Sequence, residues 1–306
     1  MRRPSRNRLR LGLGLLAFVV CMALFAPWIA TSRALAVRTD SGWRILPRSA
    51  GQEGVRINAP IPYGPNETNL AERLEPPSST HWLGTDELGR DVASRMVHGA
   101  RVSLLVGFAA AAFSLILGAL IGAAAGYYGG IVDLVVSRLI DVLIAFPFLV
   151  LLLAIVSLFG ASLWTIIIVL ALTSWTAEAR IVRGEMLRIR ELDWAAAARA
   201  SGASDAGILF RHLLPNAIAP ALVTAAFGVS SAILFESALS FLGFGVQLPH
   251  ASWGSILSTA DDYLRQAWWL ALFPGLAIFV TVLAANLIGE SLRVSLAPKS
   301  DAIVRG

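Results

Sequence analysis

Long apolar runs alternate with polar segments along this chain. They cover residues 11–30, 103–128, 132–159, 213–246 and 268–294, and a weaker run begins at Leu163. A helix needs roughly 20 apolar residues to cross a hydrocarbon layer of about 30 Å. The fourth run falls short, because its purely apolar core, LWTIIIVLAL, is about half a crossing. The pattern predicts an all-α polytopic membrane protein with six transmembrane helices, the third bent at Pro147.

The first apolar run has two interpretations. Five arginines and no acid precede it, and Ala34-Leu35-Ala36 resembles a signal-peptidase site, so a cleaved signal peptide is one of them. Its apolar core of about 20 residues is longer than the roughly 7–15 of a signal peptide. We therefore favour a retained anchor, with residues 1–30 forming a cytoplasmic N-terminus and the first transmembrane helix.

Residues 31–100 have a different texture, polar and rich in proline and glycine. They predict an irregular extracytoplasmic loop that ends in a short interfacial helix, where Leu88, Val92, Met96 and Val97 recur at helical spacing. Side chains that bind metals elsewhere occur here as well: His81, Asp86, Glu87, Asp91 and His98. Their spacing matches no metal-binding template, so we expect solvated or paired surface groups.

The arginines fix the orientation. Six of them lie between the fourth and fifth runs: Arg180, Arg183, Arg188, Arg190, Arg199 and Arg211. The loop between the third and fourth runs has no charge, and the next outer loop carries Asp261, Asp262 and Arg265. Short cytoplasmic loops carry the excess of positive charge. Both termini and the fourth-to-fifth loop are therefore expected in the cytoplasm.

Composition supports a membrane protein and limits its chemistry. Of the 306 residues, 56% are hydrophobic and 15% are charged, against about 25% charged in soluble proteins. The net charge of +5 does not indicate a nucleic-acid partner, because the arginines lie beside apolar runs rather than along one amphipathic face. Cys21 is the only cysteine, so no internal disulfide forms. Lys299 is the only lysine, which excludes a G-x-x-x-x-G-K-[ST] phosphate loop, and any ATP must be bound by another polypeptide.

The cytoplasmic segment between the fourth and fifth runs reads as two short helices. Asp193 is a plausible N-cap, residues 195–198 are four alanines, and Gly202 is a natural stop. Such a helix is about 13 Å long and spans nothing. Ser204 or Asp205 then caps a second helix that continues into the fifth run. This arrangement suits a docking lever for a soluble partner, and a resting interfacial helix is the alternative.

Three ionisable residues within the predicted spans are candidates for gating or for the transport pathway. Arg138 and Asp141 are three residues apart, so we expect them to pair on one helix face, with a gating contact as the alternative. Glu236 lies near the outer end of the fifth span and is a candidate for contact with a substrate cation, the binding protein or an arginine. A further feature is the close-packing face predicted by Gly118, Gly122 and Gly126, where local softness is the alternative.

Ala196, Ala197 and Ala198, followed by Gly202 and by His212-Leu213-Leu214-Pro215, resemble the E-A-A-x3-G-x9-I-x-L-P signature of bacterial ABC importer permeases. The strings HWLGTDELGRDVASRMVHGARVSLLVGF, FRHLLPNAIAP, ESALSFLGFGVQ and WLALFPGLAIFVTVLA further resemble the oligopeptide/dipeptide/nickel family, C-type subunit, over about residues 62–298. Two positions depart from the signature. Ala196 replaces its glutamate and His212 its isoleucine, which puts any capping or ionic role of the first position in doubt.

The resemblance implies a type I ABC importer permease with both termini in the cytoplasm. Residues 31–100 would be extracytoplasmic, 101–298 a five-helix core with a coupling loop at about 183–214, and 299–306 a cytoplasmic tail. The residues that it implies for ATPase coupling are Asp193, Ala197, Ala198, Gly202, Leu214 and Pro215. No catalytic, metal-binding or cofactor-binding residue is expected on this chain.

It also implies the partners: a second homologous permease, one or two ATPases that hold ATP and Mg, an extracytoplasmic solute-binding protein and the lipid bilayer of a bacterial inner membrane. The implied function is import of dipeptides, oligopeptides or similar solutes. Alternatives are nickel or another non-peptide solute, a secondary transporter, or an intramembrane enzyme, for which neither H-E-x-x-H nor G-x-S-x-G is present.

Overall fold

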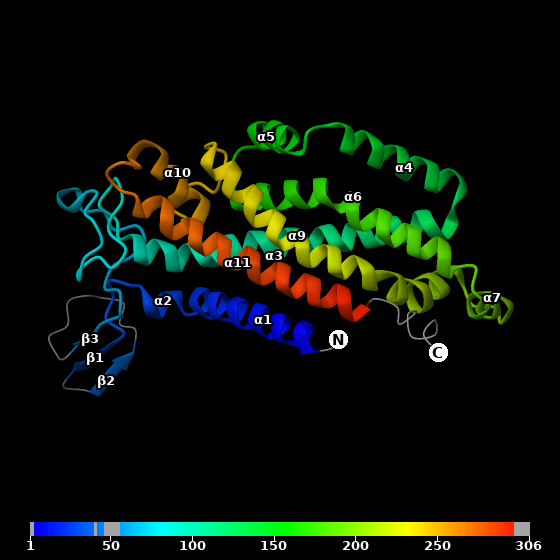
Figure 1. Cartoon of the computed structure of the whole chain (residues 1–306), viewed down its shortest axis with the longest axis horizontal. Coiled ribbons are helices and arrows are strands. Elements are labelled where there is room, and N and C mark those ends of the chain that lie inside the picture. Colours follow the sequence, from blue (N-terminus) through cyan, green and yellow to red (C-terminus); the bar gives the residue numbers. More distant parts are fainter. Residues whose placement is uncertain (1–2, 40–41, 46–55, 297–306) are drawn as a thin grey trace.

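The computed structural model describes residues 3–39, 42–45 and 56–296. Long helices lie side by side, with a small sheet at one end and α7 at the other (Figure 1). The α-helices are α1 (Arg3–Leu24), α2 (Ala26–Ile29), α3 (Val92–Tyr128), α4 (Gly130–Ala145), α5 (Phe148–Phe159), α6 (Leu163–Ile189), α7 (Asp193–Ala200), α8 (Asp205–Gly207), α9 (Leu214–Phe241), α10 (Trp253–Tyr263) and α11 (Trp269–Leu296). A 3₁₀ turn, η1 (Leu70–Glu72), and a π-helical segment, η2 (Ile208–Leu213), complete the helical elements.

Five continuous helical segments among the described residues are long and apolar enough to span a membrane: α1, α3, α6, the stretch Asp205–Phe241, and α11. The third predicted span is instead the pair α4 and α5, bent by 91° at Pro147. Because α3 ends near α7 and α6 begins at the opposite end of the bundle, α4 and α5 together connect the two ends (Figure 1). The predicted all-α polytopic fold is confirmed. In Figure 1, α1 begins and α11 ends on the half of the bundle nearer α7, so both lie on the side away from the sheet.

The glycine face of α3 packs directly against α6. A Cβ atom on Gly118 would lie 2.7 Å from the carbonyl oxygen of Trp175, and one on Gly126 would lie 2.8 Å from that of Arg183. Gly122 lies between them and faces the backbone of Ala179. Small residues of this kind let membrane helices approach closely. The predicted packing face is confirmed, and α6, whose sequence gave the weakest span signal, is a continuous helix of 27 residues.

The segment after α2 is not wholly irregular. Strands β1 (Ala36–Thr39), β2 (Gly42–Ile45) and β3 (Arg56–Ile57) form an antiparallel sheet in the order β2-β1-β3. Val37 lies opposite Arg44, and Arg38 opposite Trp43. The prediction of an irregular loop was wrong here, because these short segments contain residue types that favour strands, Val37 and Thr39 in β1 and Trp43 and Ile45 in β2. The predicted tail at 299–306 lies outside the described residues.

The short interfacial helix predicted within residues 81–102 is instead the start of α3, which begins at Val92 with Asp91 as its N-cap. Its charges are not solvated. Asp86 Oδ2 accepts a hydrogen bond from Arg90 Nε at 2.7 Å and lies 3.4 Å from Arg95 Nε, and all three side chains are buried. Local spacing suggested a wet face, whereas tertiary packing brings the charges together out of water.

Two further polar residues predicted at the surface lie within the protein: His81 is buried and His98 is half-buried. His81 Nδ1 lies 2.9 Å from Asp91 Oδ2, and His81 Nε2 lies 3.3 Å from Glu72 Oε2. His98 Nε2 contacts the carbonyl oxygen of Ala30 at 2.8 Å. Among the described residues no group of three or more potential ligands is placed to hold a metal ion. These side chains are therefore paired, as expected, but within the protein rather than on its surface.

The polar stretch between the fifth and sixth spans contains the helix α10. Ser252 and Ser255 form a capping box at its start, and Trp253 is fully buried. The indole Nε1 of Trp253 donates to the carbonyl of Met96 at 3.1 Å, and its backbone N–H donates to Ser103 Oγ at 3.1 Å. This helix thereby fastens the outer loop to α3.

Candidate coupling site at the cytoplasmic end

The helix α7 begins and ends close to the predicted positions. Asp193 is its first residue and lies in the first turn, where a carboxylate interacts favourably with the helix dipole. The carbonyl of Leu192 accepts the hydrogen bond from the N–H of Ala196, so Leu192 rather than Asp193 occupies the N-cap position. The chain leaves the helix through Gly202, whose φ of +79° favours glycine. The predicted rod of about two turns is confirmed, and it contains Ala197 and Ala198.

Beyond Gly202 the chain forms the predicted lever. Ser204 Oγ accepts a hydrogen bond from the N–H of Gly207 and caps α8. The stretch from Asp205 to Phe241 is then continuous, through η2 into the membrane helix α9. The residues of α8 therefore belong to the same continuous helical segment as the spanning helix α9.

The π-helical segment η2 has a local cause at Pro215. Proline has no N–H, and its ring collides with the carbonyl four residues earlier, so a regular α-helix is disfavoured before it. The N–H of Leu214 instead bonds to the carbonyl of Leu209, five residues back. The side chain of Asn216 donates to the carbonyl of His212 at 2.7 Å. Pro215 and Leu214, both signature positions, thus begin α9 just after a helical irregularity.

Packing and hydrogen bonds tie this segment to the membrane helices. Ala195 is fully buried in a cluster that includes Met186 of α6 and Leu213 of η2. Arg190 Nη1 donates to the carbonyl of Gly126 at 2.8 Å, at the end of α3. Tyr127 donates its hydroxyl hydrogen to Asp205 Oδ1 at 2.7 Å. The lever is therefore attached to α3 and α6 as well as to α9.

A bidentate ion pair closes the same end of the bundle. Arg183 donates from Nε to Asp133 Oδ1 and from Nη2 to Asp133 Oδ2, the second bond at 2.7 Å. The pair joins α4 to α6. Two parallel hydrogen bonds of this kind hold both orientation and distance.

The outer face of α7 is exposed. Ala196 and Ala197 are exposed, and Trp194 is 41% exposed although it is a large aromatic residue. Leu192 and Phe210, on either side of the helix, are 37% and 53% exposed. Exposed large apolar side chains of this kind, outside the apolar spans, are typical of a protein-binding surface. We call Leu192, Trp194, Ala197 and Phe210 the α7 patch.

The candidates within the spans differ in environment. Arg138 Nη1 lies 3.3 Å from Asp141 Oδ2, so the predicted ion pair is confirmed, and the side chains of both residues are largely exposed on α4. Glu236 is fully buried, and its Oε1 accepts hydrogen bonds from Ser240 at 2.8 Å and Ser252 at 2.7 Å. It therefore links α9 to the start of α10, and its role in a transport pathway stays a prediction.

A buried carboxylate in α6 was missed at the sequence level. Glu178 is 3% exposed, and its Oε2 accepts a hydrogen bond from Ser114 of α3 at 3.2 Å. It stands in TSWTAEAR, where the apolar run fades, so it did not read as an intramembrane charge. The length of α6 is the signal that places it within a span, where ionisable residues are costly and often functional.

Comparison with known proteins identifies the family of the chain. The family described as "Binding-protein-dependent transport system inner membrane component" matches residues 102–301. This chain belongs to that family. It is the multi-pass permease subunit of an ABC transporter, and ATP hydrolysis takes place on a separate subunit.

Curated relatives match along most of the chain. The "Dipeptide transport system permease protein DppC" of Alkalihalophilus pseudofirmus is 44% identical over 233 residues, which are 76% of this chain and 77% of that protein. The "Di/tripeptide transport system permease protein DppC" of Pseudomonas aeruginosa is 39% identical over 294 residues, 94% of this chain and 87% of that protein. A solved structure of the MetNI methionine ABC transporter in inward-facing conformations covers 64% of this chain and 95% of its own, with 21% identity and a TM-score of 0.48.

Proposed function

We propose that this permease imports dipeptides or oligopeptides in a bacterial inner membrane and is driven by ATPase subunits that dock on the α7 patch. The observation that carries the proposal is the exposed helix α7 at the head of a lever continuous with α9. Closure of an ATPase dimer would move α7, and the anchors at Arg190 and Tyr127 would pass this motion to α3 and α6. The membrane helices would then change from inward- to outward-facing.

The energetic requirement is modest. ATP and solute need only bind one of two conformations more tightly, and the coupling between them is reciprocal. A coupling free energy of about 1–3 kcal/mol is typical. The lever has to bias an existing equilibrium and does not have to supply the energy of transport itself.

The face of α4 supports a second homologous permease as a partner. Of the sixteen residues of α4, all of which are described, only Ile140 is buried. Its exposed surface includes Arg138 and Asp141 as well as Ile131 and Leu134. A charged pair is costly against lipid tails but acceptable at a protein interface or a water-filled path. The positive charge of Arg138 and the negative charge of Asp141 on a largely apolar helix therefore favour a protein neighbour over lipid.

The remaining assignments follow from the family and the sequence. The chain has one lysine and no phosphate-binding loop, which supports ATP and Mg being held by one or two partner ATPases. A solute-binding protein would deliver the solute at the end that carries the sheet. The names of the relatives give peptides as the transported substrates of those proteins, and we propose the same class here. Nickel or another non-peptide solute is the alternative within the family.

Uptake by reconstituted vesicles tests this function. The permease, its genomic partners and the binding protein are expected to accumulate a labelled dipeptide only with ATP. Trp194→Ala should weaken ATPase docking by about 2 kcal/mol, or about thirtyfold in affinity, as for an interface aromatic. Trp164, 60% exposed at the other end of α6, is the matched control, and Trp164→Ala should leave docking unchanged. Accumulation driven by an ion gradient without ATP would contradict the proposal.

A further inference from the structure

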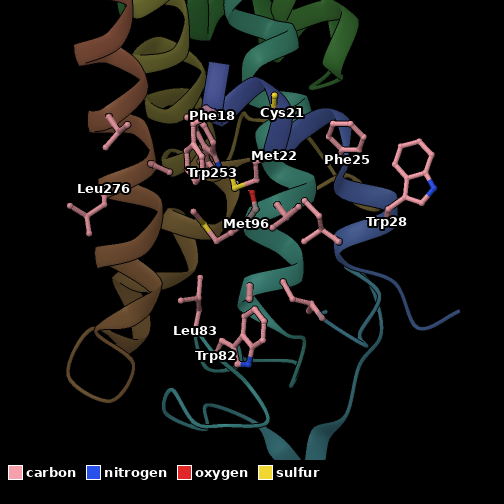
Figure 2. Close-up of a pocket in the computed structure, with 17 residues that line it drawn as sticks. Phe18, Cys21, Met22, Phe25, Trp28, Trp82, Leu83, Met96, Trp253 and Leu276 are labelled. Carbon is pink, nitrogen blue, oxygen red and sulfur yellow. Dashed lines mark hydrogen bonds between the residues drawn. The ribbon is translucent and has the colours of Figure 1, made fainter. Parts of the chain in front are cut away.

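A large apolar pocket opens between α1, α3 and α11 toward the extracytoplasmic end, with a volume of about 850 Å³. Figure 2 shows Met22 of α1 and Met96 of α3 at its middle, Leu276 of α11 on one side, Trp28 on the opposite side, and Trp82 toward the outer end. We call it the α1–α11 pocket. Nothing in the coupling mechanism uses it.

The shape of the pocket follows from how α1 meets α11. Near the midpoints of the two helices they touch, because a Cβ atom on Gly12 would lie 3.0 Å from the carbonyl oxygen of Ala284. The helices then diverge toward the sheet end (Figure 1). The gap is a wedge that widens along the membrane normal, with its narrow end near the middle of the bilayer.

The chemistry of the walls excludes water as a stable filling. All seventeen lining residues have apolar side chains, apart from indole N–H groups and the Cys21 thiol. The indole N–H of Trp253, in the floor, is already bonded to the carbonyl of Met96 at 3.1 Å. A water molecule needs two to four polar partners, and these walls supply too few. Unfilled apolar space in turn forfeits the contacts of the atoms around it.

The position of the pocket identifies the filling. Phe18 and Met22 lie in the apolar span of α1, and Leu276 lies in that of α11, so by length and composition these walls belong in the hydrocarbon layer. Phe18 and Leu276, at its mouth, are 68% and 49% exposed. Trp28 and Trp82 lie where an interfacial aromatic belt belongs. The mouth therefore faces the outer leaflet, whose acyl chains run parallel to the wedge.

We infer that the α1–α11 pocket binds an acyl chain of an outer-leaflet phospholipid as a fixed part of the folded protein. The chain replaces the missing contact between α1 and α11 and joins α1 to the core. The headgroup lies beside the indoles of Trp28 and Trp82. This inference does not rest on the transported solute or on the ATPase.

The test is photolabelling of the full chain in native membranes that contain a trace of phospholipid with a diazirine at mid-acyl chain. Trypsin releases residues 11–33 and 266–293, which hold the α1 and α11 walls. It also releases residues 102–138, from α3 and the first part of α4, which serve as an internal reference. The wall peptides should be labelled well above the reference. A larger side chain is then placed on one wall of the pocket, and the label is measured on the peptide from the opposite wall. Ala277→Phe should reduce the label on residues 11–33 about tenfold, and Cys21→Phe that on residues 266–293.

Ala112→Phe is the matched control, since Ala112 is an exposed residue of α3 outside the pocket, and it should leave both labels unchanged. Each filling variant is read on a helix that it does not alter, so a change in label reports the occupancy of the pocket. Cys21 is exposed, so its substitution does not disturb a packed core position. A folding defect would differ from filling by lowering the label on all three peptides. Equal labelling of the wall and reference peptides, or labels indifferent to both filling variants, would overturn the inference. Cross-linking of Cys21 to another protein chain would also overturn it, because a protein segment would then occupy the pocket.

Discussion

The closeness of α3 and α6 at the cytoplasmic end predicts a large effect of one methyl group. In Gly126→Ala the new Cβ atom would lie 2.8 Å from the carbonyl oxygen of Arg183 and 2.7 Å from Cβ of Met186. Ordinary contact begins near 3.4 Å, so the helices must separate by about 0.6 Å or more. Neither neighbouring atom is the end of a flexible side chain. Overpacking of this kind costs about 1–3 kcal/mol.

The matched control is Gly184→Ala, at an exposed position of α6 near the same end of the bundle, where a Cβ atom meets nothing within 4 Å. Both variants gain the helix propensity of alanine, about 0.5–1 kcal/mol. The difference between them therefore isolates the steric cost, about 2 kcal/mol, or about thirtyfold in the unfolding equilibrium.

The assay is reversible unfolding by SDS in mixed micelles, followed by helix signal, for the wild-type chain and both variants. Gly126→Ala should unfold at lower SDS than Gly184→Ala, and the bond from Arg190 to the carbonyl of Gly126 should be weakened as the helices separate. If the two variants agree within about 0.5 kcal/mol, the contact between α3 and α6 is looser than described and the reasoning is refuted.

Three further outcomes are expected. Gly202→Ala should lower the free energy of unfolding by about 1 kcal/mol because of the positive φ, whereas Gly202→Asn should lower it less. Solute-stimulated ATP hydrolysis should therefore be lower in Gly202→Ala than in Gly202→Asn. Equal losses of hydrolysis would show that side-chain size, and not backbone conformation, matters at this position. Arg183→Lys should lower unfolding free energy by about 1 kcal/mol, since lysine cannot make both bonds to Asp133, and full stability in SDS titration would show the pair to be dispensable. Burial and Asp86 raise the pKa of Glu87, so the folded state holds that proton more tightly and stability should fall as pH rises through the raised pKa; Glu87→Gln should flatten this part of the pH profile, and an unchanged profile would assign it to another group.

Features encoded by neighbouring residues were predictable from the sequence. The length of α7, the stop at Gly202 and the cap at Ser204 depend on a few adjacent positions, and the structure reproduces them. The packing face of α3 was also predictable, because glycines four residues apart must lie on one side of a helix. The cytoplasmic placement of the coupling segment, which rests on the distribution of arginines, stays a prediction.

Features that depend on contacts between distant residues were not predictable. Arg95 looked solvated beside polar neighbours, but tertiary packing buries it against Asp86. Trp253 looked like part of a polar loop, although its partner, the carbonyl of Met96, is 157 residues away. Glu178 was missed because α6 continues beyond its apolar core, and hydropathy alone does not show where such a helix ends. Each case required knowledge of which segments pack together.

The most direct test of the central claim is site-specific cross-linking at α7. Cys21→Ala removes the only cysteine, so a single new thiol can be placed at will. Ala197→Cys lies on the exposed face, whereas Ala195→Cys lies about 200° around the helix, buried against the chain's own core. With a short thiol cross-linker and the co-expressed ATPase carrying scanned surface cysteines, position 197 should cross-link to the ATPase and position 195 should not. The yield at 197 should also change when ATP is added. Failure of position 197 to reach the ATPase at any scanned cysteine, with or without ATP, would contradict the role of α7 as the coupling element.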